Sequence, residues 1–434
     1  MAERRINVDY LARVEGEGGL RVKIKGDRVT DVQVNIFEPP RFFEAFLRGR
    51  TPQETVDITA RICGICPVAY QMSAAHALEK ALGVTPPPGV RALRRLLYCG
   101  EYIESHVLHI FLLHAPDFIG HESAISMAGD PALRPLVEQA LRMKKIGNHL
   151  VTVIGGREIH PVSACVGGFY RAPRKSALTA LVPDLEWGLE RAVEAVRWAA
   201  TLDYPDFTAD YEFVSLSHPD EYPYNEGRVV SSSGLDIPVE EYERHFLEEH
   251  VEHSNALHSR RAGSKTSYMV GPLARVNLNF DRLSPRAQAA ARDIALTLPV
   301  RNPFMSLLAR GLELVHAYEE ALQLIASYVE PVPSRSPIPT PPQAGEGAHA
   351  TEAPRGLLYH RYAVDAEGLI ASARIVPPTS QNLKRMEDDL WQYVPGVLRL
   401  PHEEATLRCE QLVRSYDPCI SCATHFLKLH IERE

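Results

Sequence analysis

The first clear pattern in the chain is an alternation of apolar and polar residues close to its N-terminus. Apolar side chains occupy every second position on both sides of Gly26-Asp27, namely Leu20, Val22 and Ile24 before it and Val32, Val34 and Ile36 after it. A period of two is typical of strands, and a Gly-Asp pair suits a tight turn. The pattern predicts a β-hairpin within about residues 1–50.

Beyond this hairpin the pattern changes to helical spacing. Thr51, Pro52 and Glu54 combine a cap residue, a proline at the first helical position and a glutamate three residues after the cap, which together predict a helix start. Apolar residues with helical spacing predict further helices at about 90–111, 178–201, 285–299 and 303–329. These segments predict a helical bundle over about residues 51–330.

Prolines dominate the chain after the last of these helices. Residues 331–354 contain Pro331, Pro333, Pro337, Pro339, Pro341, Pro342 and Pro354. We expect this stretch to form an extended surface crossing, followed by irregular segments up to residue 434. The expected fold is mainly α, a single unit over residues 1–434 with a central helical bundle and a small N-terminal β portion.

Composition and charge exclude some classes of protein. The 434 residues include 47 Lys plus Arg against 55 Asp plus Glu, a net charge of -8, so no overall positive field favours nucleic acid. No apolar run is long enough for a membrane span, and the charged N-terminus lacks the apolar stretch of a secretory signal. We expect a cytoplasmic protein without a membrane span of its own.

Four of the seven cysteines form two pairs with the same spacing, Cys63-Gly-Ile-Cys66 and Cys419-Ile-Ser-Cys422. Two residues between thiolates allow both sulfurs to face one metal. On spacing alone, four interpretations remain open: a structural zinc site, a redox-active disulfide, unrelated buried cysteines or a catalytic metal centre. Arg61 precedes the first pair, and a guanidinium benefits an anionic thiolate cluster more than a structural zinc site.

The two cysteine motifs, Arg-Ile-Cys-Gly-Ile-Cys at 61–66 and Asp-Pro-Cys-Ile-Ser-Cys-Ala-Thr-His at 417–425, resemble the paired signature of nickel-iron hydrogenase large subunits. Other segments agree with that family and follow in the same order: Arg-Val-Glu-Gly at 13–16, Arg-Phe-Phe-Glu at 41–44, Glu-Ser-His-Val-Leu-His at 104–109, Gly-Gly-Arg-Glu-Ile-His-Pro at 155–161, Glu-Ala-Pro-Arg-Gly at 352–356 and Val-Pro-Pro-Thr at 376–379. The resemblance extends from about residue 6 to residue 425.

The resemblance implies a role for each cysteine of the two pairs. Cys63 and Cys419 are expected to be terminal nickel ligands, and Cys66 and Cys422 to bridge nickel to an iron that carries carbon monoxide and cyanide. Soft thiolates suit both metals. Dihydrogen would be cleaved heterolytically, with the proton taken up by the Cys419 thiolate.

The resemblance also implies roles for residues outside the cysteine pairs. Glu15 is expected to carry protons away, Arg355 to lie over the open side of the metals, and Thr379 to contact the cofactor. Glu44 and His425 are expected to bind a separate magnesium or iron ion.

Several other residues with candidate chemistry are expected to be structural. His106 and His109 lie three residues apart on one predicted helix and are interpreted as packing or supporting groups near the centre. Cys99, Cys165 and Cys409 have no partner spacing and are expected to be buried thiols.

Within the family, the cytoplasmic, nucleotide-coupled form is the most similar, through Cys-Gly-Ile-Cys-Pro-Val at 63–68 and Ala-Pro-Arg-Gly-Leu-Leu-Tyr-His at 353–360. This implies an iron-sulfur small subunit and further flavin- and NAD(P)-binding subunits as partners. It also implies nickel-insertion chaperones and a maturation protease, which in many relatives cuts after the histidine that corresponds to His425. Either this sequence is the uncut precursor or residues 426–434 are retained. Ferredoxin, deazaflavin or heterodisulfide reductase are alternative electron carriers.

Two alternatives to a hydrogenase remain. One is a relative like the quinone-site subunit of respiratory complex I, a group that has lost the cysteine pairs present here. The other is a scaffold subunit with structural zinc. Three positions depart from the family pattern: Tyr70 and Glu17 stand where histidine is common, and Ser105 stands where aspartate is common.

Overall fold

The computed structural model describes residues 3–341 and 343–424. The predicted hairpin is present as β2 (Gly18–Lys25) and β3 (Arg28–Ile36), and its alternating apolar residues are buried. Gly26 between the strands has a φ of 65°, which a glycine adopts without strain. A further strand, β1 (Glu3–Val8), pairs antiparallel with β2 and was not predicted, because only Ile6 and Val8 among its six residues are apolar.

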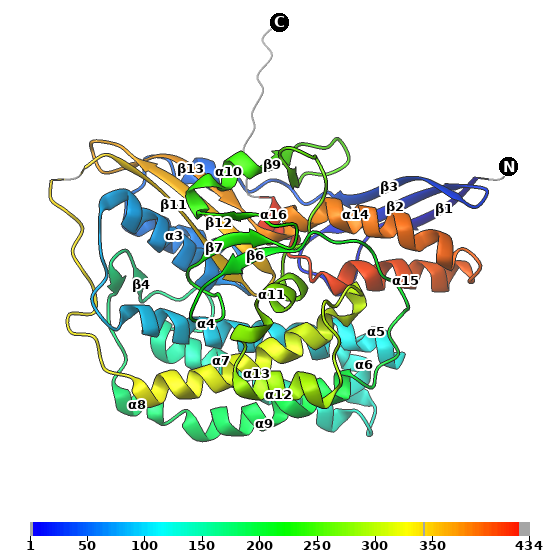
Figure 1. Cartoon of the computed structure of the whole chain (residues 1–434), viewed down its shortest axis with the longest axis horizontal. Coiled ribbons are helices and arrows are strands. Elements are labelled where there is room, and N and C mark those ends of the chain that lie inside the picture. Colours follow the sequence, from blue (N-terminus) through cyan, green and yellow to red (C-terminus); the bar gives the residue numbers. More distant parts are fainter. Residues whose placement is uncertain (1–2, 342, 425–434) are drawn as a thin grey trace, which may run out of the picture.

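Four long helices form the bundle: α4 (Val90–Val107), α7 (Arg134–Gly155), α9 (Val182–Ala199) and α13 (Ser306–Ser327). They lie together in the lower half of Figure 1. Glycines allow the close packing, since a Cβ on Gly147 of α7 would lie 2.7 Å from the carbonyl oxygen of Gly100 in α4. In the same way, Gly188 of α9 accommodates the ring of Tyr318 from α13.

The predicted helices are largely confirmed, with shifted ends. The capping box is present at α2 (Pro52–Thr59), where Thr51 and Glu54 exchange hydrogen bonds. At the helix predicted for 90–111, the α-helical part ends at Val107, and a π-helix over Leu108–His114 follows directly. The helix predicted at 285–299 is only α12 (Pro285–Asp293), because Ala295 has a left-handed φ of 51°.

The expectation of irregular C-terminal segments was wrong. The structure has an antiparallel sheet there, in the order β11 (Gly345–Ala353), β12 (Gly356–Val364) and β13 (Ile370–Val376). Two long helices follow, α14 (Pro378–Val397) and α15 (His402–Ser415), and then the short α16 (Ile420–Ala423).

Strand β11 was missed because its sequence, GEGAHATEA, does not alternate and is buried almost throughout. It lies against α3 (Pro67–Leu82) so closely that a Cβ on Gly347 would be 2.2 Å from the carbonyl oxygen of Ala77. Small residues therefore mark a close contact between elements here, not a surface loop. The predicted crossing at 331–354 contains β11 from Gly345 to Ala353, and its described residues before Gly345 form neither a helix nor an extended strand.

Shorter elements complete the described chain. The helices are α1 (Phe43–Phe46), α5 (Ala115–Ile119), α6 (Ala124–Gly129), α8 (Lys175–Thr179), α10 (Tyr242–His245) and α11 (Pro272–Asn279). Strand β4 (Ala164–Cys165) pairs with β5 (Gly168–Phe169), and β9 (Phe246–Glu249) pairs with β10 (His258–Arg261). A three-stranded sheet has the order β6 (Val214–Ser217), β7 (Arg228–Ser231) and β8 (Asp236–Ile237).

One hydrophobic core joins the N-terminal sheet, the bundle and the C-terminal helices, since its buried residues extend from Ile6 to Ala423. Figure 1 shows the N-terminal strands beside α14 and α15, so an N-terminal and a C-terminal segment of the described chain lie side by side. Across residues 3–341 and 343–424, no helix combines the length and the apolar character needed to span a membrane.

Candidate metal centre

The four cysteines of the two pairs converge although they lie at opposite ends of the chain. Cys66 directly precedes Pro67, the first residue of α3, and Cys419 directly precedes α16. The sulfurs of Cys63 and Cys419 lie 3.5 Å apart, and those of Cys63, Cys419 and Cys422 all lie within 4.8 Å of one another. All four side chains are buried and none forms a disulfide.

Arg41, from the Arg-Phe-Phe-Glu segment, connects the two cysteine motifs. Its guanidinium donates to the carbonyl oxygen of Ile62 at 2.7 Å and to that of Ser421. Its backbone N–H donates to the carbonyl oxygen of Thr424 at 2.6 Å. Arg41 thus connects the two segments that carry the cysteine pairs and holds them close together.

Glu15 lies directly beside the cluster. Its Oε2 accepts hydrogen bonds from the Cys419 thiol at 3.0 Å and from the backbone N–H of Ser421 at 3.1 Å. Its carbonyl oxygen also accepts from the backbone N–H of Ile420 at 2.8 Å. The next residue must be glycine, because Gly16 has a φ of 88° and a Cβ there would be 2.8 Å from that of Ile420.

Each of the four thiols changes the pKa values of the others. Hydrogen bonds from the thiols of Cys419, Cys422 and Cys66 hold the pKa of Cys63 well below its ordinary value. The pKa of Cys66 is raised well above the ordinary value, chiefly by its contact with Cys419, and burial raises those of Cys419 and Cys422. The cluster therefore favours a single thiolate unless a bound cation compensates for further negative charge.

Arg355 supplies a positive charge next to the thiols. It is buried in the turn between β11 and β12, and its Nε and Nη2 donate to the carbonyl oxygen and the carboxylate of Asp417 at 2.8 and 3.0 Å. Burial opposes this charge, but Asp417 and the neighbouring cysteines outweigh burial and raise the pKa of Arg355 well above its ordinary value. Its Nη1 has no hydrogen-bond partner within residues 3–341 and 343–424.

Asp417 is a site residue to which the sequence analysis gave no role. It adopts a left-handed φ of 54°, which brings both its carbonyl oxygen and its side chain to Arg355. The available signal was its position two residues before Cys419, within the second cysteine motif.

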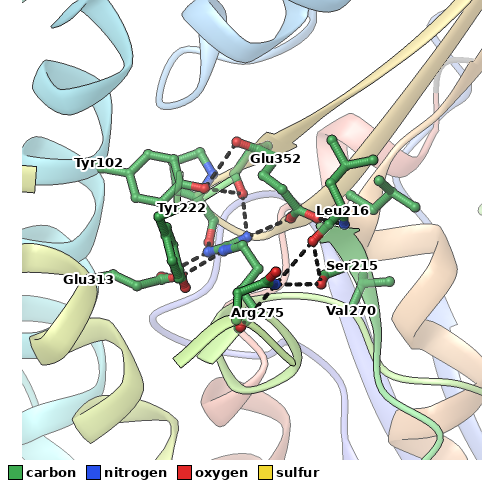
Figure 2. Close-up of polar contacts among 12 residues, drawn as sticks. Tyr102, Ser215, Leu216, Tyr222, Val270, Arg275, Glu313 and Glu352 are labelled. Atoms are coloured by element: carbon green, nitrogen blue, oxygen red, sulfur yellow. Dashed lines mark hydrogen bonds and ion pairs between the residues drawn. The ribbon is translucent and has the colours of Figure 1, made fainter. Parts of the chain in front are cut away.

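The turn that carries Arg355 is itself held by a buried ionic network, drawn in Figure 2. The guanidinium of Arg275, from α11, donates to the carbonyl oxygens of Ala353 and Pro354, each at 2.8 Å. It also forms ion pairs with Glu313 at 2.6 Å and with Glu352 at 2.9 Å, and all three side chains are completely buried. Nothing in the local sequence around Arg275 predicted this role.

Replacing Arg275 by methionine is expected to destabilise the metal-free protein by about 3–5 kcal/mol, because two buried carboxylates lose their shared cation. The matched control is Arg286→Met, which removes an exposed ion pair with Glu190 and should cost no more than about 1 kcal/mol. Denaturant unfolding of the three proteins measures both values. Equal losses in the two variants would contradict the assigned importance of the buried network.

The remaining predicted residues are placed as follows. Thr379 Oγ1 accepts a hydrogen bond from the backbone N–H of Cys419 at 2.9 Å, so this hydroxyl borders the cluster. Glu44 Oε1 accepts from the backbone N–H of Ile375 at 2.8 Å. His425 lies outside the described residues, so its predicted partnership with Glu44 stays a prediction.

His106 and His109 are buried structural histidines, in line with the expectation. His106 Nε2 lies 2.8 Å from a carboxylate oxygen of Glu313, and His109 Nε2 donates to the carbonyl oxygen of Arg414 at 2.8 Å. The three remaining cysteines are also buried free thiols, as expected: Cys99, Cys165 and Cys409.

Two of the positions that depart from the family pattern are buried. Burial and the neighbouring cysteines raise the pKa of Tyr70 well above its ordinary value, so this phenol stays protonated. The hydroxyls of Tyr70 and Ser105 have no hydrogen-bond partner within the ranges that the structure describes. Glu17, in contrast, has an exposed side chain.

The fold and this site define a mainly helical protein that encloses a four-thiol metal centre between its two chain ends. Residues 41–134 and 240–425 match the sequence profile of the nickel-dependent hydrogenases. The chain belongs to this family, as a large, catalytic subunit of the nickel-iron type.

Individual relatives agree over nearly the whole chain. The alpha subunits of sulfhydrogenases 1 and 2 from Pyrococcus furiosus are 35% and 33% identical, each over 98% of this chain and over 98% and 100% of their own lengths. The crystal structure of an NAD+-reducing [NiFe]-hydrogenase in its H2-reduced state superimposes with a TM-score of 0.83 at 27% identity, covering 97% of this chain and 99% of that one.

Proposed function

We propose that this chain carries out reversible cleavage of dihydrogen at a nickel-iron centre held by Cys63, Cys66, Cys419 and Cys422. The observation that carries the proposal is the convergence of the four buried thiols beside Glu15 and Arg355. In the proposed assignment, Cys63 and Cys419 would be terminal nickel ligands, and Cys66 and Cys422 would bind both nickel and iron. Carbon monoxide and cyanide would be the other ligands of the iron.

The residues present fit such a group. Four sulfur donors match the preference of nickel and low-spin iron for soft ligands, and their coupled pKa values call for a cation. Nη1 of Arg355 is a buried donor without a partner in residues 3–341 and 343–424, and a cyanide or an incoming molecule would satisfy it. When bound, the nickel-iron group supplies the heterolytic cleavage of dihydrogen into protons and electrons.

The chain itself would move the protons. Cys419 Sγ accepts a proton and passes it to Oε2 of Glu15, which lies 3.0 Å away. Glu15 is half-buried, so its carboxylate lies between the buried thiols and the exterior. Arg355 keeps its charge throughout, and Asp417 holds it in place.

We further propose that Thr379 borders the bound cofactor, because its hydroxyl already orients the backbone of Cys419. Glu44 and His425 would bind magnesium or iron close to the C-terminal segment. Maturation would use nickel-insertion chaperones and a protease that cuts after His425.

The electrons are proposed to leave through an iron-sulfur small subunit and then a flavin-containing diaphorase to NAD(P), in the cytoplasm. The similarity to sulfhydrogenase alpha subunits and to an NAD+-reducing hydrogenase supports this route. Cys99, Cys165 and Cys409 are buried and belong to neither pair, so partner subunits must supply the cluster relay.

The carrier can be tested with the purified complex under hydrogen. We expect reduction of NAD+ or NADP+ at rates well above those with ferredoxin or a deazaflavin. Faster reduction of ferredoxin or deazaflavin would replace the nucleotide route and leave the hydrogenase assignment intact.

Metal analysis tests the centre itself. We expect nickel and iron in the anaerobically purified complex, together with infrared bands of carbon monoxide and cyanide. The four thiols account for this result, because they offer a soft donor set that requires cations. Zinc alone without these bands, in protein from a host able to build the cofactor, would instead support a structural scaffold.

A further inference from the structure

A second group of potential metal ligands lies outside the cysteine cluster. His253 belongs to the loop between β9 and β10, His258 is the first residue of β10, and Glu387 belongs to α14. One ligand atom from each lies within 4.8 Å of the others. His253 Nε2 is 2.7 Å from Glu387 Oε1, and His258 Nδ1 is 3.7 Å from Glu387 Oε2.

His258 is the unusual member of this group. Its side chain is only 1% exposed, and neither ring nitrogen has a hydrogen-bond partner within residues 3–341 and 343–424. A buried polar group without a partner destabilises the fold, so such groups are rare without a functional reason. Burial also lowers the pKa of His258 to about 4, which keeps the imidazole neutral and able to donate a lone pair to a metal.

Glu387 is oriented toward the two histidines. The backbone N–H of Val34, in β3, donates to its Oε1 at 3.1 Å. Lys384 lies 3.9 Å from Oε2, but its ammonium pairs much more closely with Asp388, at 2.6 Å. The carboxylate therefore remains available to the histidines, and three separate packed elements hold the group in place.

An ion could reach this group from solvent. His253 is partly exposed and borders a polar cavity of about 270 Å³, whose lining includes Gln33, Asn35 and Asn255. The cavity has room for a water molecule as a further ligand.

We propose that His253, His258 and Glu387 form a second metal site, for zinc, with water as the fourth ligand. Two imidazoles and one carboxylate are a typical zinc donor set, whereas calcium and magnesium prefer oxygen ligands alone. A bound ion would replace the direct contact between His253 and Glu387 and would satisfy His258. It would also connect the β9–β10 hairpin to α14.

The first test uses the purified complex with its cysteine centre loaded, stripped of weakly bound metal and then given zinc alone. We expect one zinc per chain whose X-ray absorption spectrum shows nitrogen and oxygen ligands at about 2.0–2.1 Å, imidazole scattering and no sulfur. Zinc bound through sulfur at about 2.3 Å, or no zinc above the stripped level, would overturn the proposal.

The second test compares variants in zinc affinity. Loss of an outer-shell partner alone weakens metal binding about 10–100-fold, so His258→Gln and Glu387→Gln should each weaken zinc binding by more than about 100-fold. The matched control is His402→Gln, which changes an exposed histidine at the start of α15 and should keep the parent affinity.

Nickel content and hydrogen oxidation close to those of the parent would show that the variants are folded. If a variant fails to fold, the absorption spectrum of the parent complex still decides between imidazole and sulfur ligands. Unchanged zinc affinity in folded His258→Gln and Glu387→Gln would exclude this second site. This conclusion does not depend on the metal content or the activity of the cysteine centre.

Discussion

Glu15→Gln is expected to reduce hydrogen oxidation by at least about 100-fold while nickel and iron content stay at the parent level. General acid–base groups contribute about 10²–10⁴ in rate, and glutamine can neither accept nor release the proton that Cys419 would pass on. The contact is direct, since Oε2 lies 3.0 Å from the Cys419 sulfur. The amide can still accept a hydrogen bond, so the centre should assemble.

Exchange of deuterium gas with solvent protons provides a second measurement for this variant, because it requires proton passage but no electron carrier. It should fall together with the oxidation rate. Glu17→Gln is the matched control, since it makes the same change two residues away on an exposed side chain and should leave both rates unchanged. Near-parent activity in a fully metallated Glu15→Gln protein would remove this residue from the proton route.

Arg355→Lys is expected to lower turnover by about 10²–10³, the range seen when one fixed electrostatic donor is removed from an active site. An ammonium cannot reproduce the planar fork that reaches both the carbonyl oxygen and the carboxylate of Asp417. It would also lose the Nη1 donor, for which the described part of the chain offers no hydrogen-bond partner. The lysine would keep the positive charge but would place it at a different position.

The control for this variant is Arg361→Lys, which makes the same exchange on β12, the strand that follows Arg355, in a partly exposed pair with Glu243. It should turn over like the parent. Infrared bands of carbon monoxide and cyanide report whether the centre is intact in Arg355→Lys. Equal rates in the Arg355→Lys protein and its parent, at equal nickel content, would contradict the assigned role.

Both predictions depend on contacts between residues that are far apart in the sequence. Glu15 and Cys419 are brought together by a backbone contact between the N- and C-terminal segments, where Ile420 donates to the carbonyl oxygen of Glu15. The position of Arg355 depends on two further residues: Asp417, which accepts its hydrogen bonds, and Arg275, which donates to the carbonyl oxygen of Pro354 in its turn. A substitution of either residue would change the site without removing a proposed metal ligand.

Local chemistry in the sequence was enough for some features. The alternation in β2 and β3, the capping box at Thr51 and the helical spacing of the bundle each report a preference that neighbouring residues satisfy among themselves. The spacing of the cysteine pairs likewise restricts the chemistry, because two thiolates at this separation can face one metal. The spacing led to the four cysteines, and the family resemblance led to Glu15 and Arg355.

Only the tertiary structure decided which distant groups meet. Strand β11 carries no alternation because both of its faces are buried, so its pairing depends on the close approach of α3. Packing between segments far apart in the chain places Asp417 beside Arg355 and Arg275 between two buried glutamates. It also leaves the His258 ring without a hydrogen-bond partner among the described residues. A residue's sequence neighbours determine its local conformation, whereas its partners in a dry interior are set by the whole fold.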